Sequence, residues 1–142
     1  MPDKKAHAKW NGDLKGGNGS MSSESGVLEN AAFTFASRFE NEGKSNPEEL
    51  IAAAHAGCYS MALSNELHKA GYNSKSVETK ATISLGPVDG KPTIHTIILE
   101  ATATIPDIDE VEFQKIAAAT KAACPVSRAL NMAIKLEATL VN

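Results

Sequence analysis

Residues 45–63, SNPEELIAAAHAGCYSMAL, constrain the fold more than any other stretch of the chain. The first half of this segment is apolar on nearly every helical face, which is typical of a helix buried at the centre of a protein. Ser45 and Glu48 have the spacing of a capping box, with Asn46 as the rival cap, and Gly71 offers a left-handed end. We therefore expect one central helix of about 24 residues, roughly 36 Å long.

This helix carries chemical groups that packing alone does not require. Glu48, His55 and Cys58 all lie in it, although ionised groups are costly to bury unless they have partners. The segment is therefore either a functional site or an accident of composition, and the rest of the chain must distinguish the two.

The remaining pattern predicts strands on both sides of this helix and a second helix near the end of the chain. Strands are expected at 6–11, toward Val27 and Leu28, at 33–39, and in a hairpin of 77–85 and 93–105 joined by GPVDGKP. A second helix, capped by Asp107 or Asp109 with Ile108 as a staple, should run to Ala123; a short helix from Pro125 and an alternating strand, MAIKLEATLV, should follow. The order β-β-β-α-β-β-α-β predicts an α+β fold, a single domain over 1–142, with mostly antiparallel sheets packed around the long central helix.

The charge balance and the apolar runs exclude several classes of protein. The net charge is −3, with 17 acidic and 14 basic side chains and no basic cluster, so we expect no nucleic-acid partner. The opening residues lack the apolar core of a signal peptide. The longest apolar run, 50–63, is too short to cross a bilayer. We expect a cytoplasmic protein with no membrane partner.

The two cysteines, Cys58 and Cys124, leave two interpretations open. They lie 66 positions apart and form no CxxC motif, which excludes a disulfide-stapled scaffold. They can be inert buried hydrophobes in a non-enzymatic ligand-binding or stress protein. Because Cys124 precedes a proline, however, the helix should break there, and the pair could form a disulfide if their Cα atoms come within about 7 Å.

A reactive thiolate at Cys58 would need a cation. The chain has only two arginines, Arg38 and Arg128, and a guanidinium keeps its charge when buried. We expect Arg38, oriented by Glu48, to serve, and Arg128 to be solvated. Glu48 and Cys58 are ten residues apart, about 15 Å along a helix. A shared site should therefore combine Cys58 of one subunit with Glu48 and Arg38 of another in a two-fold dimer.

His55 allows further alternatives because it lies three residues before Cys58. The two could form the nucleophile and base of an acyl or thiol transferase. His55 could equally be a core histidine bonded to a backbone or side-chain acceptor. A zinc site made of His55, Cys58 and Cys124 lacks a fourth ligand, so no metal is expected.

Three stretches of the chain carry a resemblance to a known family: TFASRFENEGKSNPEELIAAAHAGCYSMAL, AACPVSRAL and AHAKWNGDLKGGNGSMSSESGVL. They resemble the family of osmotically inducible protein C and the organic hydroperoxide resistance proteins, on the osmotically inducible branch. The resemblance covers essentially the whole chain. It implies an intertwined α+β homodimer with interface active sites, and a two-cysteine peroxidase without metal or other cofactor. It also implies a role for each site residue: Cys58 as peroxidatic thiolate, Cys124 as resolving cysteine, Glu48 as the carboxylate and Arg38 as the arginine.

The implied chemistry is the reduction of organic hydroperoxides to alcohols, in defence against oxidative or osmotic stress. Cys58 would become a sulfenic acid and then form an intramolecular disulfide with Cys124. An external thiol, with a dithiol such as a lipoyl group as one candidate, would reduce the enzyme again. An apolar lining around Cys58, expected from Ile51, Ala54 and Met61 with Phe33 or Phe35, predicts a preference for alkyl or lipid hydroperoxides over hydrogen peroxide.

Overall fold

The computed structural model describes residues 1–142, which form two compact units, residues 1–50 and residues 51–142. The long helix α2 (Pro47–Lys69) passes through the boundary. Its observed length confirms the predicted central helix. The single domain over 1–142, with both sheets packed around this helix, stays a prediction.

Residues 1–50 contain a three-stranded antiparallel sheet followed by a short helix. The strands are β1 (Ala6–Asn11), β2 (Asn18–Ser23) and β3 (Ala31–Phe33), paired in that order. The second strand, predicted to run toward Val27 and Leu28, is present as β2 but ends at Ser23. The chain instead turns back there, with the Leu28 N–H donating to the Ser23 hydroxyl and the Ser23 N–H donating to the Leu28 carbonyl, both at 2.9 Å.

The strand predicted at 33–39 is also wrong beyond its first residue. Residues Phe35–Phe39 form the helix α1, because Thr34 and Ser37 make a reciprocal capping box. A capping residue satisfies backbone N–H groups that a helix start leaves unpaired. The capping hydrogen bonds of Thr34 and Ser37 therefore outweigh the strand preference indicated by the alternating apolar residues.

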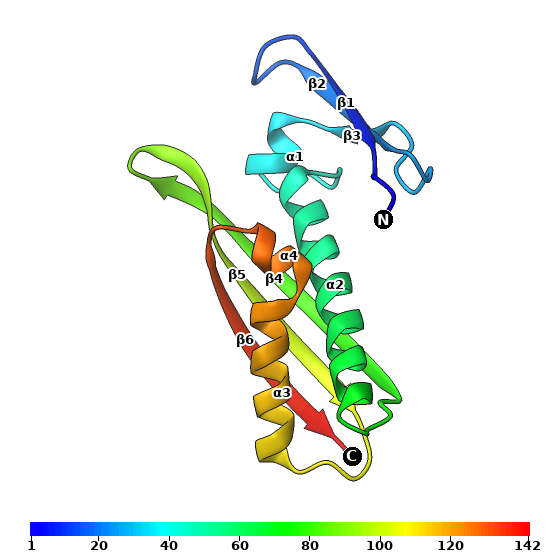
Figure 1. Cartoon of the computed structure of the whole chain (residues 1–142). Coiled ribbons are helices and arrows are strands. Elements are labelled where there is room, and N and C mark those ends of the chain that lie inside the picture. Colours follow the sequence, from blue (N-terminus) through cyan, green and yellow to red (C-terminus); the bar gives the residue numbers. More distant parts are fainter. The chain divides into compact units, whose positions relative to one another are not determined.

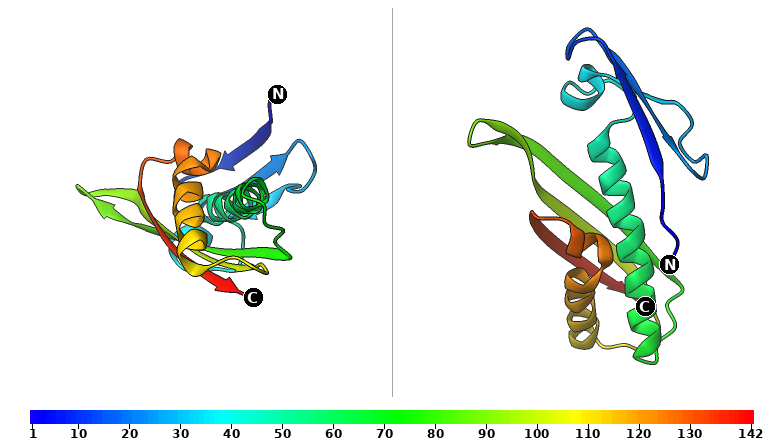
Figure 2. Two further views of the ribbon diagram at one scale, coloured as in Figure 1. Left: turned by 60° about the horizontal axis from the view of Figure 1, so that its bottom comes forward. Right: turned by 45° about the horizontal axis from the view of Figure 1, so that its top comes forward.

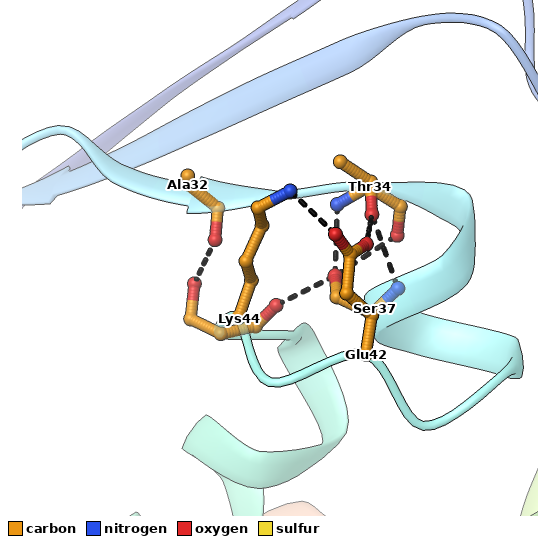
Figure 3. A network of polar contacts seen from close by, with 6 residues as sticks. Ala32, Thr34, Ser37, Glu42 and Lys44 are labelled. Atoms are coloured by element: carbon orange, nitrogen blue, oxygen red, sulfur yellow. Dashed lines mark hydrogen bonds and ion pairs between the residues drawn. The ribbon is translucent and has the colours of Figure 1, made fainter.

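A polar network holds the loop between α1 and α2 (Figure 3). Glu42 accepts from the Thr34 hydroxyl and the Lys44 ammonium, both at 2.6 Å. The Ser45 hydroxyl donates to the Ala32 carbonyl at 2.8 Å. The predicted capping box with Glu48 does not form, because α2 begins at Pro47 and Ser45 lies one residue before the capping position.

Asn46, the rival cap, begins α2 instead. Its side-chain oxygen accepts from the Glu49 N–H at 2.8 Å. At the other end Gly71 has φ of +96°, and the Gly71 and Tyr72 N–H groups donate to the His68 and Leu67 carbonyls. This is the left-handed helix end that the sequence predicted.

Residues 51–142 contain the second sheet, in the order β4-β5-β6. The predicted hairpin is confirmed: β4 (Ser76–Val88) and β5 (Lys91–Thr104) are antiparallel and join through Asp89 and Gly90, both with positive φ. The last strand β6 (Ala133–Val141) pairs with β5 in parallel. A parallel neighbour needs a long crossover connection, and α3 (Glu110–Ala123) with α4 (Pro125–Ala129) supplies it.

The helices of this unit cover one face of the β4-β5-β6 sheet, while the closed end of the hairpin extends past α4 (Figures 1 and 2). The core lies between them. Asp109 caps α3 and Ile108 is buried in this core, as predicted. The core side chains come from α2, β5 and α3 and include Tyr59, Leu63, Leu67, Leu99, Ala101, Ala103, Phe113 and Ala117. None of the helices combines the length and apolarity needed to cross a bilayer.

Candidate active site

Cys58 and Cys124 meet where α2 lies against the break between α3 and α4. Their sulfur atoms are 3.0 Å apart, and both are free thiols. Cys124 has φ of −54° and ψ of 128°, which is the extended geometry that a following proline imposes. The helix break predicted at Cys124 is therefore confirmed, and it turns the Cys124 side chain toward α2. A disulfide bond is about 2 Å long, so a small movement would join the two sulfurs.

A second contact lies beside the sulfur pair. The Nε2 atom of His55 lies 2.7 Å from the Ser127 hydroxyl, and both side chains are buried. The Nδ1 atom of His55 is buried without a hydrogen-bond partner. Neither ring nitrogen bonds Cys58, so the geometry agrees with the core-histidine interpretation and not with a Cys/His nucleophile pair.

The two thiols have opposite tendencies to ionise within the protomer. Burial raises the pKa of Cys58, and the adjacent Cys124 thiol raises it further. Burial acts in the same direction on Cys124, but hydrogen bonds from Cys58, from Ser127 and from the Val126 backbone outweigh it and lower the pKa of Cys124. Residues 51–142 thus stabilise a thiolate at Cys124 and provide no cation for Cys58.

Arg38 and Glu48 form the predicted ion pair in residues 1–50. Nε and one terminal nitrogen of Arg38 lie 2.9 and 2.8 Å from the same Glu48 oxygen, Oε1. The Glu48 side chain is 8% exposed and that of Arg38 40%, so the carboxylate is fixed while the guanidinium can still reach another group. Arg38 comes from α1 rather than from the predicted strand. Arg128 is exposed, as expected.

An aromatic cavity of about 250 Å³ adjoins Arg38 within residues 1–50. It is lined by Trp10, Leu14, Phe33, Thr34, Phe35, Arg38 and Phe39. The sequence reasoning named Phe33 and Phe35 but missed the other apolar members. Phe35 and Phe39 pack at a centroid distance of 4.9 Å because they lie four residues apart on a helix. The signal that could have found Phe39 was the Thr34–Ser37 capping box.

The helix residues expected to line the site behave differently. Met61 is 79% exposed and lines an open depression of about 420 Å³ together with Ser64, Asn65 and His68. Ile51 is half-buried and Ala54 is exposed. Residues 51–142 therefore do not enclose these three side chains in an apolar pocket, whereas the aromatic cavity of residues 1–50 is apolar.

Comparison with known proteins identifies the family. Residues 40–139 match the model of the OsmC-like protein family. The chain is 47% identical over 134 residues to the peroxiredoxin OsmC of Escherichia coli K12, covering 94% of each sequence.

Solved structures agree on the fold. An OsmC-like protein of unknown function from Vibrio cholerae superposes with a TM-score of 0.77 at 15% identity, covering 97% of this chain and 99% of the other. An organic hydroperoxide resistance protein from Elizabethkingia anophelis superposes with a TM-score of 0.70 at 26% identity, covering 97% and 96%. The chain therefore belongs to the OsmC family, with the α+β fold of its members.

Proposed function

We propose that the protein is a cysteine-based peroxidase that reduces organic hydroperoxides to alcohols. The observation that carries this proposal is the 3.0 Å separation of the Cys58 and Cys124 sulfurs. Two free thiols at this distance can store and release two electrons as a disulfide. Close similarity to a protein named peroxiredoxin supports the same conclusion.

The reaction uses the two thiols in sequence. The Cys58 thiolate attacks the terminal oxygen of the hydroperoxide, the O–O bond breaks, and the alkoxide takes a proton and leaves as the alcohol. Cys58 then carries a sulfenic acid. Cys124 attacks the Cys58 sulfur, and water leaves as the disulfide forms. An external thiol, for which a dithiol is suited, reduces the disulfide. A reducing compartment such as the cytoplasm supplies such thiols.

Activation of Cys58 requires a second subunit in this proposal. Burial raises the pKa of Cys58, so a positive charge must offset it. Arg38 has five N–H donors, and Glu48 holds it through a single oxygen. The guanidinium can therefore also face a thiolate. Ten helical residues separate Glu48 from Cys58, which favours Arg38 of a partner subunit over that of the same chain.

An exposed face of α2 supports such a homodimer. Ala53, Gly57 and Met61 follow each other at intervals of four residues and are all exposed in the protomer. A helix with this apolar composition is normally covered, and small side chains allow another backbone to come close. A two-fold dimer would contain two equivalent sites.

The aromatic cavity beside Arg38 gives the proposed substrate preference. Its volume of about 250 Å³ and its aromatic walls suit an alkyl or aryl group, whose burial is favourable in proportion to its apolar area. Hydrogen peroxide has no such group and gains nothing from the cavity. We therefore propose alkyl or lipid hydroperoxides as substrates.

Stoichiometric oxidation tests the proposed function. Reduced protein treated with one equivalent of cumene hydroperoxide should yield one equivalent of cumyl alcohol and a Cys58–Cys124 disulfide, mapped by mass spectrometry. The Cys124→Ser variant should accumulate a sulfenic acid on Cys58 that dimedone traps, whereas Cys58→Ser should not react. Unchanged thiols in the wild-type protein would instead indicate two inert buried cysteines.

A further inference from the structure

The sulfur pair and the His55–Ser127 pair form two parallel links between the same two helices. His55 precedes Cys58 by three residues in α2, and Ser127 follows Cys124 by three residues at α4. Residues three apart lie on one side of a helix. The measured separations are 3.0 Å between the sulfurs and 2.7 Å between His55 Nε2 and the Ser127 hydroxyl. Each link therefore fixes the position of the other.

The burial of His55 costs free energy, because one of its ring nitrogens lacks a hydrogen-bond partner. The side chain is 0% exposed, and its Nδ1 atom has no hydrogen-bond partner. A buried polar atom without a partner costs free energy that an apolar side chain of similar size would avoid. The one side-chain hydrogen bond that the imidazole makes is to the Ser127 hydroxyl.

We propose that His55 and Ser127 are positioning residues for the resolving step: their hydrogen bond holds the α4 turn so that Cys124 reaches the oxidised Cys58. This inference rests on the proposed peroxidase function and names two residues that serve its second step. All four side chains belong to residues 51–142.

The direction of the hydrogen bonds follows from the partnerless nitrogen. A buried N–H without an acceptor is rarer than a partnerless lone pair, so the proton belongs on Nε2, which donates to the Ser127 oxygen. The Ser127 hydroxyl proton is then free to point to the Cys124 sulfur. Hydrogen bonds from Ser127 contribute to the lowered pKa of Cys124, and burial lowers the pKa of His55, which keeps the imidazole neutral.

The resolving step needs such control because it competes with further oxidation. The Cys124 thiolate attacks the sulfur of the Cys58 sulfenic acid, the S–S bond forms and the S–O bond breaks. The departing hydroxide takes up the proton that the Cys124 thiol released, so water leaves. Cys124 is oxidised and Cys58 reduced. If the attack is slow, a second hydroperoxide converts Cys58 to the sulfinic acid, which is generally irreversible.

Two pairs of variants separate positioning from simple packing. Ser127→Ala removes the hydroxyl, and Ser127→Thr keeps it. His55→Leu removes the donor, and His55→Gln keeps a donor near the position of Nε2. Rapid-quench mass spectrometry after one equivalent of cumene hydroperoxide gives the rates of sulfenic acid formation and of disulfide formation separately.

We expect Ser127→Ala to slow disulfide formation about tenfold, the effect of one lost hydrogen bond to a charged group, and His55→Leu to slow it about fivefold, the effect of one lost hydrogen bond between neutral groups. Sulfenic acid formation should stay within about twofold of wild type in both variants. Ser127→Thr and His55→Gln should recover most of the rate. The pH midpoint of the resolving step should rise in Ser127→Ala, because the hydrogen bonds from Ser127 that lower the pKa of Cys124 would be weakened. Cys58, Tyr59 and His55 are the other titratable groups of α2 beside Cys124, and the same shift should be absent from Cys58 alkylation.

Unchanged disulfide formation in Ser127→Ala and His55→Leu would overturn the inference, as would Thr and Gln variants no faster than the Ala and Leu variants. Exchange with dithiobis(nitrobenzoate) separates this result from failure of the peroxidase proposal. The first thionitrobenzoate reports attack by one cysteine, and the second reports closure by the other. A delayed second release in Ser127→Ala supports the positioning role even if hydroperoxide does not oxidise the wild-type protein.

Discussion

At the scale of single residues, the chemistry of the site depends on which of the two cysteines ionises more readily. Burial raises the pKa of Cys58, while hydrogen bonds lower the pKa of Cys124 against the effect of burial. Residues 51–142 thus favour a thiolate at Cys124 and provide no cation for Cys58. Arg38, held by the buried Glu48, is the group that we propose completes the site.

The Arg38–Glu48 geometry predicts that charge alone is insufficient. Arg38→Lys keeps a cation but loses the planar fork that contacts Glu48 through two nitrogens. We expect sulfenic acid formation to slow at least about tenfold, the effect of losing one charged hydrogen bond, as measured by dimedone trapping in a Cys124→Ser background. The matched control is Arg128→Lys, which changes the exposed arginine and should leave the rate unchanged. Equal rates for Arg38→Lys and its control would contradict the role given to Arg38.

His55 predicts a pH dependence of stability. Burial lowers the pKa of His55 below its ordinary value of 6.5, so the unfolded chain binds a proton more readily than the folded chain. The contribution of the neutral histidine is complete above pH 6.5 and is lost as the pH falls through the folded pKa. Urea unfolding between pH 7.5 and pH 5 should therefore show a steeper loss of unfolding free energy in the wild type than in His55→Gln. Parallel curves would contradict this assignment.

At the scale of elements, two glycines should respond in opposite ways to alanine. A Cβ atom on Gly19 of β2 would lie 2.6 Å from the Phe33 ring and 2.7 Å from the Trp10 ring, whereas one on Gly57 of α2 would meet nothing within 4 Å. We expect Gly19→Ala to destabilise by about 1–3 kcal/mol through overpacking. In the dissociated protomer, Gly57→Ala should stabilise by about 0.5–1 kcal/mol, because glycine is a poor helix former. Denaturant unfolding of both variants measures the difference, and the same sign for both would refute the local geometry.

The elements also show what could be predicted from the sequence. The long helix, its glycine end, the 77–105 hairpin and the break at Cys124 followed from strong local features: an apolar helical segment, a left-handed glycine, a turn and a proline. The strand predicted over 33–39 failed because the alternation of FTFASRF concealed the Thr34 cap.

The candidate site was predictable in parts. The identities of Cys58, Cys124, Arg38 and Glu48 followed from their chemistry and from the family resemblance, and the structure brings them together in two pairs. The His55–Ser127 bond joins residues 72 positions apart, so no local pattern could reveal it. The aromatic cavity was also not predictable, because its shape depends on the helix α1, where the alternating sequence predicts a strand.

At the scale of the whole molecule, the proposed mechanism requires the two pairs to come together. The Arg38–Glu48 pair lies in residues 1–50 and the cysteine pair in residues 51–142. We propose that they meet between two copies of the chain, with the exposed Ala53, Gly57 and Met61 face of α2 contributing to the contact. The expected assembly is a two-fold dimer in which each subunit supplies a cation to the other's thiol.

The proposed dimer can first be checked by asking whether the dimer and the peroxidase activity are lost together. Met61→Glu places a charge on the exposed apolar face of α2, which should weaken the dimer and reduce peroxidase activity together, since charge is costly to bury without a partner. Sedimentation equilibrium and activity measured over the same protein concentrations should show both losses. The matched control, Val111→Glu, introduces the same charge at an exposed apolar side chain of α3 and should leave both the dimer and the activity unchanged. If Met61→Glu remained dimeric and fully active, this face would not be the contact.

Complementation between two inactive variants tests the central claim most directly. Cys58→Ser lacks the peroxidatic thiol, and Arg38→Met lacks the cation. Co-expressed with different tags in equal amounts, they should form mixed dimers in half of the population, each with one intact site. The account predicts about a quarter of the wild-type peroxidase activity in the mixture, and about half in purified mixed dimers. Mixed dimers no more active than either parent would contradict it.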